Sequence, residues 1–582
     1  MISLSRFCIA LTLSFGFFHT ALASNENISP EASSGLENKS AQTATQAMVV
    51  AANPLASQVG LQMLKAGGSA ADAAIAVQLM LNLVEPQSSG IGGGAFAVWF
   101  DGSKQALTTF DGRETAPMAA TPALFLKDDG EPLKFYDAVV GGRSVGTPGT
   151  LALLKKLHER AGKLPWASLF TPTIELARTG FPLSPRLHTM LEWDAGRLLQ
   201  SPAAQDLYFA NDVPLPIGTI LRNPAFADTL ELIASEGIEP FYEGSLAEEI
   251  VASVQKHPTN PGKLSKSDLS SYQVIERLPV CGDYRGKSVC GMGPPSSGAL
   301  TVAQILGILN HFDLSKPDVT SFHLLAEASR LAFADRGLYM ADADFVSVPM
   351  QGLVDPSYLK QRAALIDPQR AAEEAAKPGT PPMEKESSME LHGDESIELP
   401  STSHFSIVDS DGNAISVTTS IENGFGSRIM VGGFLLNNEL TDFSFRAEKN
   451  GKIVANRLQP GKRPRSSMSP TIVLNEDGSL HSLLGSPGGS RIIGFVTQAV
   501  IALLDWGMSP QEAASMGHII NRNWVTELEE GSPMMDFKAE LEAMGHTVKP
   551  YQHTSGLHII KLDNSTLIGG ADPRREGQVL GY

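Results

Sequence analysis

The chain has 582 residues, of which 42% are hydrophobic and 19% charged, a composition typical of a globular protein with a large core. Its formal net charge of −18 argues against nucleic acid as a partner, because phosphate binding requires a basic surface. The length allows several domains, but no internal stretch has the composition of an interdomain linker. One large interleaved unit is therefore also consistent with the sequence.

The N-terminus has the pattern of an export signal. Arg6 precedes an apolar run at residues 7–18, and Ala21-Leu22-Ala23 has the small-x-small pattern that signal peptidase recognises. Residues 1–23 are therefore predicted to be a signal peptide. Residues 24–45 are polar and alanine-rich, and they are predicted to form a disordered leader.

Neither a lipid anchor nor a membrane span is predicted. Cys8 lies inside the apolar run, and the most apolar later segment, 492–506, is too short to cross a bilayer and is predicted to be a core helix. The mature protein is therefore expected to be periplasmic or secreted, without a membrane anchor. Its two remaining cysteines, Cys281 and Cys290, flank a turn-rich stretch, where a disulfide and two free thiols are both consistent with the spacing.

Most of the predicted elements in the first half of the mature chain are helices. Apolar spacing and end signals predict helices at 54–65, 70–83 and 223–237, and a helical region at 147–180. Another helix is predicted at 321–339. Its charged side chains are expected to form a salt-bridged structural face, and they are Glu327, Arg330, Asp335 and Arg336.

The second half is strand-rich before it returns to helices. Alternating apolar residues predict a hairpin of strands 405–408 and 414–418 around a turn that contains Gly412. Further strands are predicted at 95–100, 432–436, 471–474 and 480–484, and final helices at 495–504 and 537–544. Helices, then strands, then helices predict a layered α+β sandwich.

Thr402 lies at an abrupt change of composition. Residues 373–398 are acidic, with too few apolar side chains to offset the entropy of ordering, so the segment is predicted to be flexible. The hairpin begins immediately after Thr402. Cleavage there would give a threonine that carries a hydroxyl nucleophile and an α-amine base, whose unperturbed pKa is about 7.7–8.0.

No cofactor and no metal site are predicted. The histidines are scattered, and two cysteines cannot build a closed zinc site. The glycine run at 90–94 lacks the Gly-Lys-Ser/Thr ending of a phosphate-binding loop. His404, beside the candidate nucleophile, is interpreted as a packing or hydrogen-bonding residue because the α-amine already supplies a base.

Several short motifs carry a family resemblance. They begin with Asn53-Pro54-Leu55-Ala56-Ser57 and Gly90 to Gly94 and end with Asp572-Pro573-Arg574-Arg575-Glu576-Gly577. Between them lie Asp111-Gly112-Arg113-Glu114-Thr115, Pro294-Pro295-Ser296-Ser297-Gly298, Thr402-Ser403-His404-Phe405, Asn437-Asn438-Glu439-Leu440-Thr441-Asp442, Pro464-Arg465-Ser466-Ser467-Met468-Ser469 and Gly485-Ser486-Pro487-Gly488-Gly489. Their order and content resemble the gamma-glutamyltransferase (gamma-glutamyl transpeptidase, glutathione hydrolase) family.

The resemblance implies a four-layer αββα sandwich of the N-terminal nucleophile hydrolase type. It also implies self-cleavage between Ser401 and Thr402, giving a large subunit, 46–401, with a flexible acidic tail, 373–401, and a small catalytic subunit, 402–582. The two subunits would stay associated as a heterodimer and form one interleaved domain. The expected substrates are glutathione and other γ-glutamyl compounds, with amino acids or dipeptides as acceptors.

The resemblance also implies roles for individual residues. Thr402 is the expected nucleophile, supported by the Ser420 hydroxyl, with Gly488 and Gly489 as backbone donors to the oxyanion. Arg113 matches the arginine that binds the substrate α-carboxylate. The remaining expected contacts are hydroxyls beside that carboxylate and carboxylates around the α-ammonium, namely Ser466, Ser467, Glu422, Glu439 and Asp442.

Two segments depart from the family pattern. The span 445–461, where relatives often have a lid with a tyrosine, is charged and contains no tyrosine. The motif Gly517-His518-Ile519-Ile520-Asn521-Arg522 replaces a Pro-Arg-x-His-like sequence, for which a structural change without loss of chemistry is expected.

Two other functions remain open. A glutaryl or cephalosporin acylase of the same superfamily would use the same nucleophile, but its substrates shift or omit the α-ammonium, so the three carboxylates favour a γ-glutamyl substrate. An uncleaved binding protein is the second alternative. Loss of the nucleophile or of the oxyanion glycines would indicate it, and both are present.

Overall fold

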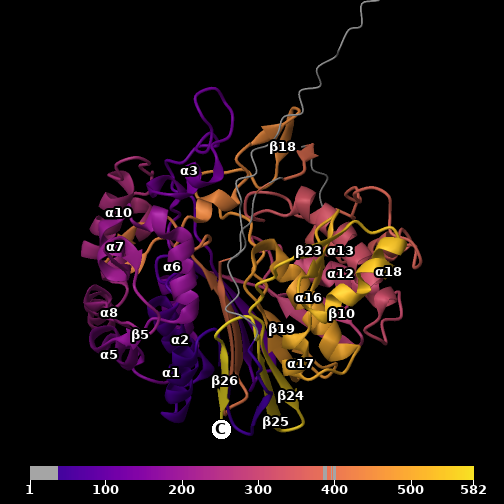
Figure 1. Cartoon of the computed structure of the whole chain (residues 1–582), viewed down its shortest axis with the longest axis horizontal. Helices are drawn as coiled ribbons and strands as arrows, with labels where there is room; N and C mark the ends of the chain where they lie inside the picture. Colours follow the sequence, from indigo (N-terminus) through magenta and orange to yellow (C-terminus); the bar gives the residue numbers. More distant parts are fainter. Residues whose placement is uncertain (1–36, 384–389, 395, 397–400) are drawn as a thin grey trace, which may run out of the picture.

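The computed structural model describes residues 37–383, 390–394, 396 and 401–582. Two seven-stranded sheets lie at its centre, with helices on both outer sides (Figure 1). All neighbouring strands within these two sheets run antiparallel. The predicted signal peptide, 1–23, lies outside the described residues.

The first sheet contains the hairpin that follows Thr402. Its strands, in spatial order, are β26 (Gln578–Gly581), β2 (Met48–Ala51), β13 (Ser403–Val408), β14 (Ala414–Ser420), β3 (Gly94–Asp101), β4 (Ala106–Gly112) and β9 (Ile275–Arg277). Both hairpin strands are buried along their whole length because the sheet is covered on its two faces. Phe405 and Ile407 enter the core below the helices, while the Ser406 hydroxyl donates to the His558 carbonyl of the other sheet.

The second sheet packs against the first through a small apolar cluster that includes Val50, Val98, Ile472 and Leu483. Its strands, in spatial order, are β1 (Gln42–Ala44), β25 (Thr566–Ala571), β24 (His558–Asp563), β20 (Leu480–Leu484), β19 (Thr471–Leu474), β11 (Lys287–Gly291) and β10 (Val280–Tyr284).

One helical layer covers the first sheet and is drawn in indigo and magenta in Figure 1. It contains α1 (Pro54–Lys65), α2 (Ala70–Val84), α4 (Thr150–Ala161), α5 (Thr171–Thr179), α6 (Pro185–Leu198), α7 (Pro202–Tyr208), α8 (Pro224–Glu236), α9 (Glu239–Tyr242), α10 (Ser245–Gln255) and α11 (Lys266–Ser270). Every residue of α2 is buried, and its alanines allow close packing against α1. The predicted helical region at 147–180 is divided into α4 and α5, since Gly162 and Pro165 interrupt it.

The other helical layer covers the second sheet. It contains α12 (Gly298–Leu309), α13 (Val319–Tyr339), α14 (Met350–Leu353), α15 (Pro356–Ala363), α16 (Ile492–Leu504), α17 (Pro510–Ser515) and α18 (Lys538–Ala543). The helix α16 is buried in this layer's core, as predicted for a core helix. None of the described helices has both the length and the apolar character needed to cross a bilayer. Two helical layers around two sheets confirm the predicted αββα sandwich.

The smaller elements lie at the ends and sides of the sandwich. They are α3 (Phe135–Val139), β5 (Phe181–Pro182) with β8 (Ile220–Leu221), β6 (Phe209–Ala210) with β7 (Val213–Pro214), β15 (Met430–Val431) with β16 (Phe434–Leu435), β12 (Leu391–His392) with β18 (Lys452–Val454) and β17 (Glu448–Lys449), and β21 (Ile519–Asn521) with β22 (Thr526–Glu529) and β23 (Val548–Tyr551).

Two segments predicted to lack order are structured where they are described. Residues 42–44 of the predicted leader form β1, and Lys39 donates to the carbonyls of Asp572, Arg575 and Gly577. In the acidic segment, Glu374 and Gly379 contact α13, where Arg330 donates to the Glu374 carbonyl at 2.8 Å and Asp335 accepts from the Gly379 amide at 2.6 Å. These contacts use backbone groups, so side-chain composition did not predict them. Residues 24–36, 384–389, 395 and 397–400 of the two segments lie outside the described residues.

Cys281 and Cys290 form a disulfide. They occupy directly paired positions on β10 and β11, so the strand register brings the two thiols together. This resolves the alternative that the sequence left open.

Candidate active site

The predicted site residues come together around one small pocket. Of the ten, only Gly488 does not line it, and it is the neighbour of Gly489, which does. The pocket holds about 20 Å³, enough for about one water molecule. Its predicted lining residues are Arg113, Thr402, Ser420, Glu422, Glu439, Asp442, Ser466, Ser467 and Gly489.

Thr402 lies immediately before the central strand β13 and is buried. Its hydroxyl oxygen is 3.5 Å from the Ser420 hydroxyl at the end of β14. The Ser420 hydroxyl in turn donates to the Ser401 carbonyl at 2.8 Å. A donor on this carbonyl withdraws electron density from the carbon that Thr402 would attack.

Other contacts hold the Ser401–Thr402 peptide, and the motifs predict no role for them. Arg575 donates to the Thr402 carbonyl at 3.1 Å, and the Ser401 hydroxyl donates to the Gln87 carbonyl at 2.8 Å. The Ser403 hydroxyl donates to Glu85 at 3.0 Å. Arg575 belongs to a motif that carried the family resemblance, so the sequence did contain a signal for it.

Arg113 lies at the end of β4 and is fully buried. Its guanidinium pairs with Glu439 and with Asp442, the latter at 2.5 Å. It also donates to the carbonyls of Pro464 and Arg465, which fix its plane. The site therefore contains a fixed cation next to carboxylates.

Three carboxyl groups, those of Glu422, Glu439 and Asp442, line this pocket together. Burial raises the pKa of Glu422 well above its usual value, and the neighbouring Asp442 and Glu439 raise it further. Burial also raises the pKa of Glu439 to about 8, although Arg113 opposes the shift. Among the described residues, Glu422 Oε1 and Glu439 Oε2 have no hydrogen-bond partner. Buried acceptors in this state attract a cationic ligand that also donates hydrogen bonds.

Ser466 and Ser467 also line the pocket, and an arginine of α13 contacts Ser467. Arg336 donates to the Ser467 hydroxyl at 2.7 Å and to the Ser297 hydroxyl at 2.8 Å. The helical pattern predicts a structural role for Arg336, but its side chain reaches the site. The ion pair of Glu327 with Arg330 on the same helix is structural, as predicted.

The turn at Gly488 and Gly489 requires glycine. Both residues have positive φ angles, 138° and 58°, in a region that side chains strongly disfavour. A Cβ on Gly488 would lie 2.6 Å from the Phe495 ring. The turn brings Gly489 to the pocket that Thr402 lines, although the oxyanion role of these amides stays a prediction.

His404 is not part of this pocket. It is fully buried, and its ring contacts the hydroxyls of Thr418 at 2.9 Å and Ser406 at 3.2 Å. Burial lowers its pKa well below the usual value. The interpretation of His404 as a packing and hydrogen-bonding residue is therefore confirmed.

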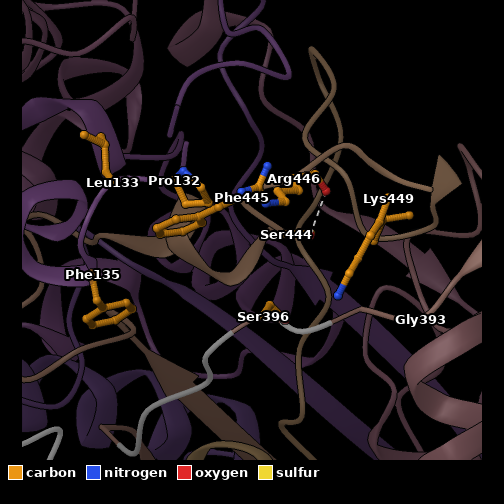
Figure 2. Close-up of a pocket in the computed structure, with 10 residues that line it drawn as sticks. Pro132, Leu133, Phe135, Gly393, Ser396, Ser444, Phe445, Arg446 and Lys449 are labelled. Atoms are coloured by element: carbon orange, nitrogen blue, oxygen red, sulfur yellow. Dashed lines mark hydrogen bonds between the residues drawn. The ribbon is translucent and has the colours of Figure 1, made fainter. Parts of the chain in front are cut away.

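The charged span at 445–461 contains a small hairpin formed by β17 and β18. Its strand β18 pairs with β12 of the acidic segment, with Leu391 opposite Ile453. Figure 2 shows Gly393 and Ser396 of the acidic segment near residues of this span. Together with Phe135 and Phe445, they line a cavity of about 210 Å³. The hairpin is thus attached to the segment that precedes the predicted cleavage site.

Comparison with known proteins agrees with this geometry. The protein is 38% identical to the glutathione hydrolase proenzyme of Bacillus subtilis strain 168 (94% of this chain, 93% of the relative) and 37% identical to that of Escherichia coli K12 (98% and 97%). Among solved structures, the cephalosporin acylase of Bacillus halodurans matches with a TM-score of 0.83 and 29% identity (95% of this chain, 99% of that chain). The gamma-glutamyltranspeptidase of Helicobacter pylori matches with a TM-score of 0.54 and 34% identity (58% and 95%).

The αββα sandwich with a hydroxyl residue at the start of a central strand defines an N-terminal nucleophile hydrolase. The family profile described as Gamma-glutamyltranspeptidase matches residues 56–582. The chain belongs to the gamma-glutamyltranspeptidase family, as its motifs predicted.

Proposed function

We propose that this protein is the precursor of an exported enzyme that cuts itself between Ser401 and Thr402 and then acts on glutathione and other γ-glutamyl amides. The observation that carries the substrate class is that buried Arg113 lines the same pocket as Glu422 and Glu439, each of which has a carboxylate oxygen without a hydrogen-bond partner among the described residues. A γ-glutamyl group has a free α-carboxylate and a free α-ammonium. One fixed cation and several anions fit that pair of charges.

Self-cleavage would begin with attack of the Thr402 hydroxyl oxygen on the Ser401 carbonyl carbon. The carbon–nitrogen bond breaks, the nitrogen takes the hydroxyl proton, and an ester joins Ser401 to the Thr402 side chain. Water then hydrolyses the ester, leaving a carboxylate on Ser401 and a free hydroxyl and amine on Thr402. The hydrogen bond from Ser420 to the Ser401 carbonyl supports this step.

Turnover would use the same hydroxyl, with the new α-amine as its base. Thr402 attacks the γ-carbonyl, the amine leaves, and the γ-glutamyl ester passes to water or to an amino-acid or dipeptide acceptor. Gly488 and Gly489 would supply the backbone donors to the oxyanion. The pocket of about 20 Å³ is too small for a γ-glutamyl group, so the Ser401 end would have to withdraw after cleavage before substrate binds.

The proposed products of cleavage are a large subunit, 46–401, and a small subunit, 402–582, that remain together. Relatives named as proenzymes support a processed precursor. The Cys281–Cys290 disulfide supports an oxidising compartment and hence export to the periplasm or beyond the cell.

Intact-mass analysis of the mature protein beside Thr402→Ala tests the proposal. We expect two fragments divided at Ser401–Thr402 in the wild type and one chain in the variant, with release of p-nitroaniline from γ-glutamyl-p-nitroanilide by the wild type alone. Uncut wild-type protein would contradict self-cleavage. Cut protein without activity on this anilide would contradict the substrate class.

Acylase activity is the second candidate. It is favoured by the cephalosporin acylase structure and by the acylase ACY 1 proenzyme of Pseudomonas sp. strain SE83, 34% identical over 93% of this chain. A glutaryl group has the carboxylate but no ammonium. Faster cleavage of glutaryl-p-nitroanilide than of the γ-glutamyl anilide would therefore establish the acylase in place of the γ-glutamyl enzyme.

A further inference from the structure

A second, larger cavity adjoins the catalytic pocket. It holds about 660 Å³, against about 20 Å³ for the catalytic pocket. Residues that are neighbours in the sequence line the two cavities. Arg465 lines the larger cavity and Ser466 the smaller one. Likewise, Ser490 lines the larger cavity and Gly489 the smaller one. Arg336 lines the larger cavity and donates to Ser467 in the smaller.

Positive charge dominates this cavity. Four arginines from separate parts of the chain line it, namely Arg336, Arg465, Arg491 and Arg522. Arg491 and Arg522 share one carboxylate, Glu527, at 2.7 Å and 3.1 Å. Two guanidiniums on one carboxylate leave an excess of positive charge, and such a concave site attracts anions.

A carboxylate already occupies the cavity in the uncleaved chain. Asp394, seven residues before Ser401, lines it and pairs with Arg465 at 2.9 Å. The side chains of both residues are almost completely buried, 1% and 3% exposed. Asp394 also accepts from Asn456 at 2.9 Å. The cavity is thus able to bury and pair a carboxylate.

The position of the cavity points to the part of the substrate that it would receive. If the catalytic pocket holds the γ-glutamyl group, the amine half extends from the scissile bond into neighbouring space. When that amine is an amino acid or a peptide, it ends in a carboxylate. The acceptor amine attacks the ester from the place that the leaving amine vacates, so both kinds of amine would use the same space.

Resting on the proposed function, we infer that the arginine-lined cavity is the subsite for the carboxylate of the amine half. Asp394 fills it before cleavage, and the cut at Ser401–Thr402 frees the segment that carries Asp394. The cavity then favours substrates whose leaving or accepting amine bears a carboxylate over those with a neutral amine. Arg465 and Arg522 are the specificity residues, since Arg336 also supports Ser467 in the catalytic pocket.

Two anilides that share the γ-glutamyl half provide the donor test. We compare kcat/KM for γ-glutamyl-3-carboxy-4-nitroanilide and for neutral γ-glutamyl-p-nitroanilide in processed protein. The wild type is expected to prefer the carboxylated anilide, and Arg465→Gln to lower that ratio about tenfold, the usual effect of losing one charged hydrogen-bonded contact. Arg522 is more exposed than Arg465, so Arg522→Gln provides a second measurement of the same ratio if Arg465→Gln is not processed. Arg178→Gln, whose exposed side chain pairs with Asp228 and Glu231, is the control for net charge.

The acceptor test uses neutral γ-glutamyl-p-nitroanilide as donor, with glycylglycine or glycylglycinamide as acceptor. If the same variants lose the preference for glycylglycine, the cavity binds the carboxylate of the acceptor. If they lose the preference for the carboxylated anilide in the donor test, the cavity binds the carboxylate of the leaving group. If both ratios are the same in the wild type and the two variants, the inference is wrong. Failure of the proposed function is distinct, because the neutral anilide would then not be cleaved by the wild type.

Discussion

At the scale of single residues, the site is a set of short hydrogen bonds whose partners lie far apart in the sequence. Ser420 is an example, because its hydroxyl links the Ser401 carbonyl to Thr402 across a hairpin. Motifs predicted the nucleophile, Arg113 and the carboxylates. They did not predict the reach of Arg336 from α13 to Ser467, since a helical pattern shows which face a residue occupies but not which distant loop it meets.

We expect Ser420→Ala to slow self-cleavage about 10–100-fold, because the scissile carbonyl loses the donor that polarises it. The measurement is the rate at which the two fragments appear after synthesis of the precursor. Ser420→Thr restores a hydroxyl at the same position and should cleave at close to the wild-type rate. Equal rates in the alanine variant and the wild type would show that the hydrogen bond has no role in cleavage.

Glu439 predicts a pH dependence of substrate binding. With its pKa raised to about 8, this carboxyl is largely protonated near pH 6 in the empty site, and only the ionised form attracts an ammonium. KM for γ-glutamyl-p-nitroanilide should therefore fall as the pH rises from about 6 to about 8. In Glu439→Gln, KM should be higher and its pH dependence flatter. An unchanged pH profile in the variant would exclude Glu439 as the titrating group.

At the scale of elements, the described residues of the segment before the proposed cleavage site are held more firmly than their composition indicates. Arg362 donates to the Lys377 carbonyl and Arg330 to the Glu374 carbonyl, so charged side chains order a backbone with few apolar residues. Farther along, β12 pairs with β18, and Asp394 pairs with Arg465. Helix α8 was easier to predict, since its Asn223 cap, Pro224 and terminal Gly237 are local signals.

We expect Asp394→Asn to slow self-cleavage severalfold, because the segment loses the buried ion pair that fixes it seven residues before the scissile bond. Fragment formation over time is the measurement. The matched control is Glu390→Gln in the same segment, since Glu390 pairs with Lys452 at the surface and such pairs contribute little. Similar slowing in both variants would indicate a general charge effect and not anchoring by Asp394.

At the scale of the whole molecule, the parts of the chain on either side of Ser401 share both sheets. In the first sheet, β13 and β14 lie between β2 and β3. In the second, β19 pairs with β11, and β25 pairs with β1. The sequence predicted the layers, because apolar patterning sets which face of an element is buried. It could not predict this strand order, which depends on pairings between distant segments.

The shared sheets predict that the two fragments remain together after cleavage. Processed protein should elute from a size-exclusion column as one species in native buffer, and it should separate into two fragments only in denaturant. Separation of the two fragments would break the backbone hydrogen bonds between their paired strands in both central sheets. Elution of the fragments as separate species at micromolar concentration would contradict the prediction.

The last strand, β26, pairs with β2 near the start of the fold, and Arg575 reaches the Thr402 carbonyl from only seven residues before the C-terminus. On the proposed mechanism, the peptide to be cut is therefore contacted by a side chain that is added to the growing chain 173 residues later. A nascent chain that does not yet contain Arg575 would lack this contact, so the order of synthesis itself would act as a checkpoint on the proposed cleavage.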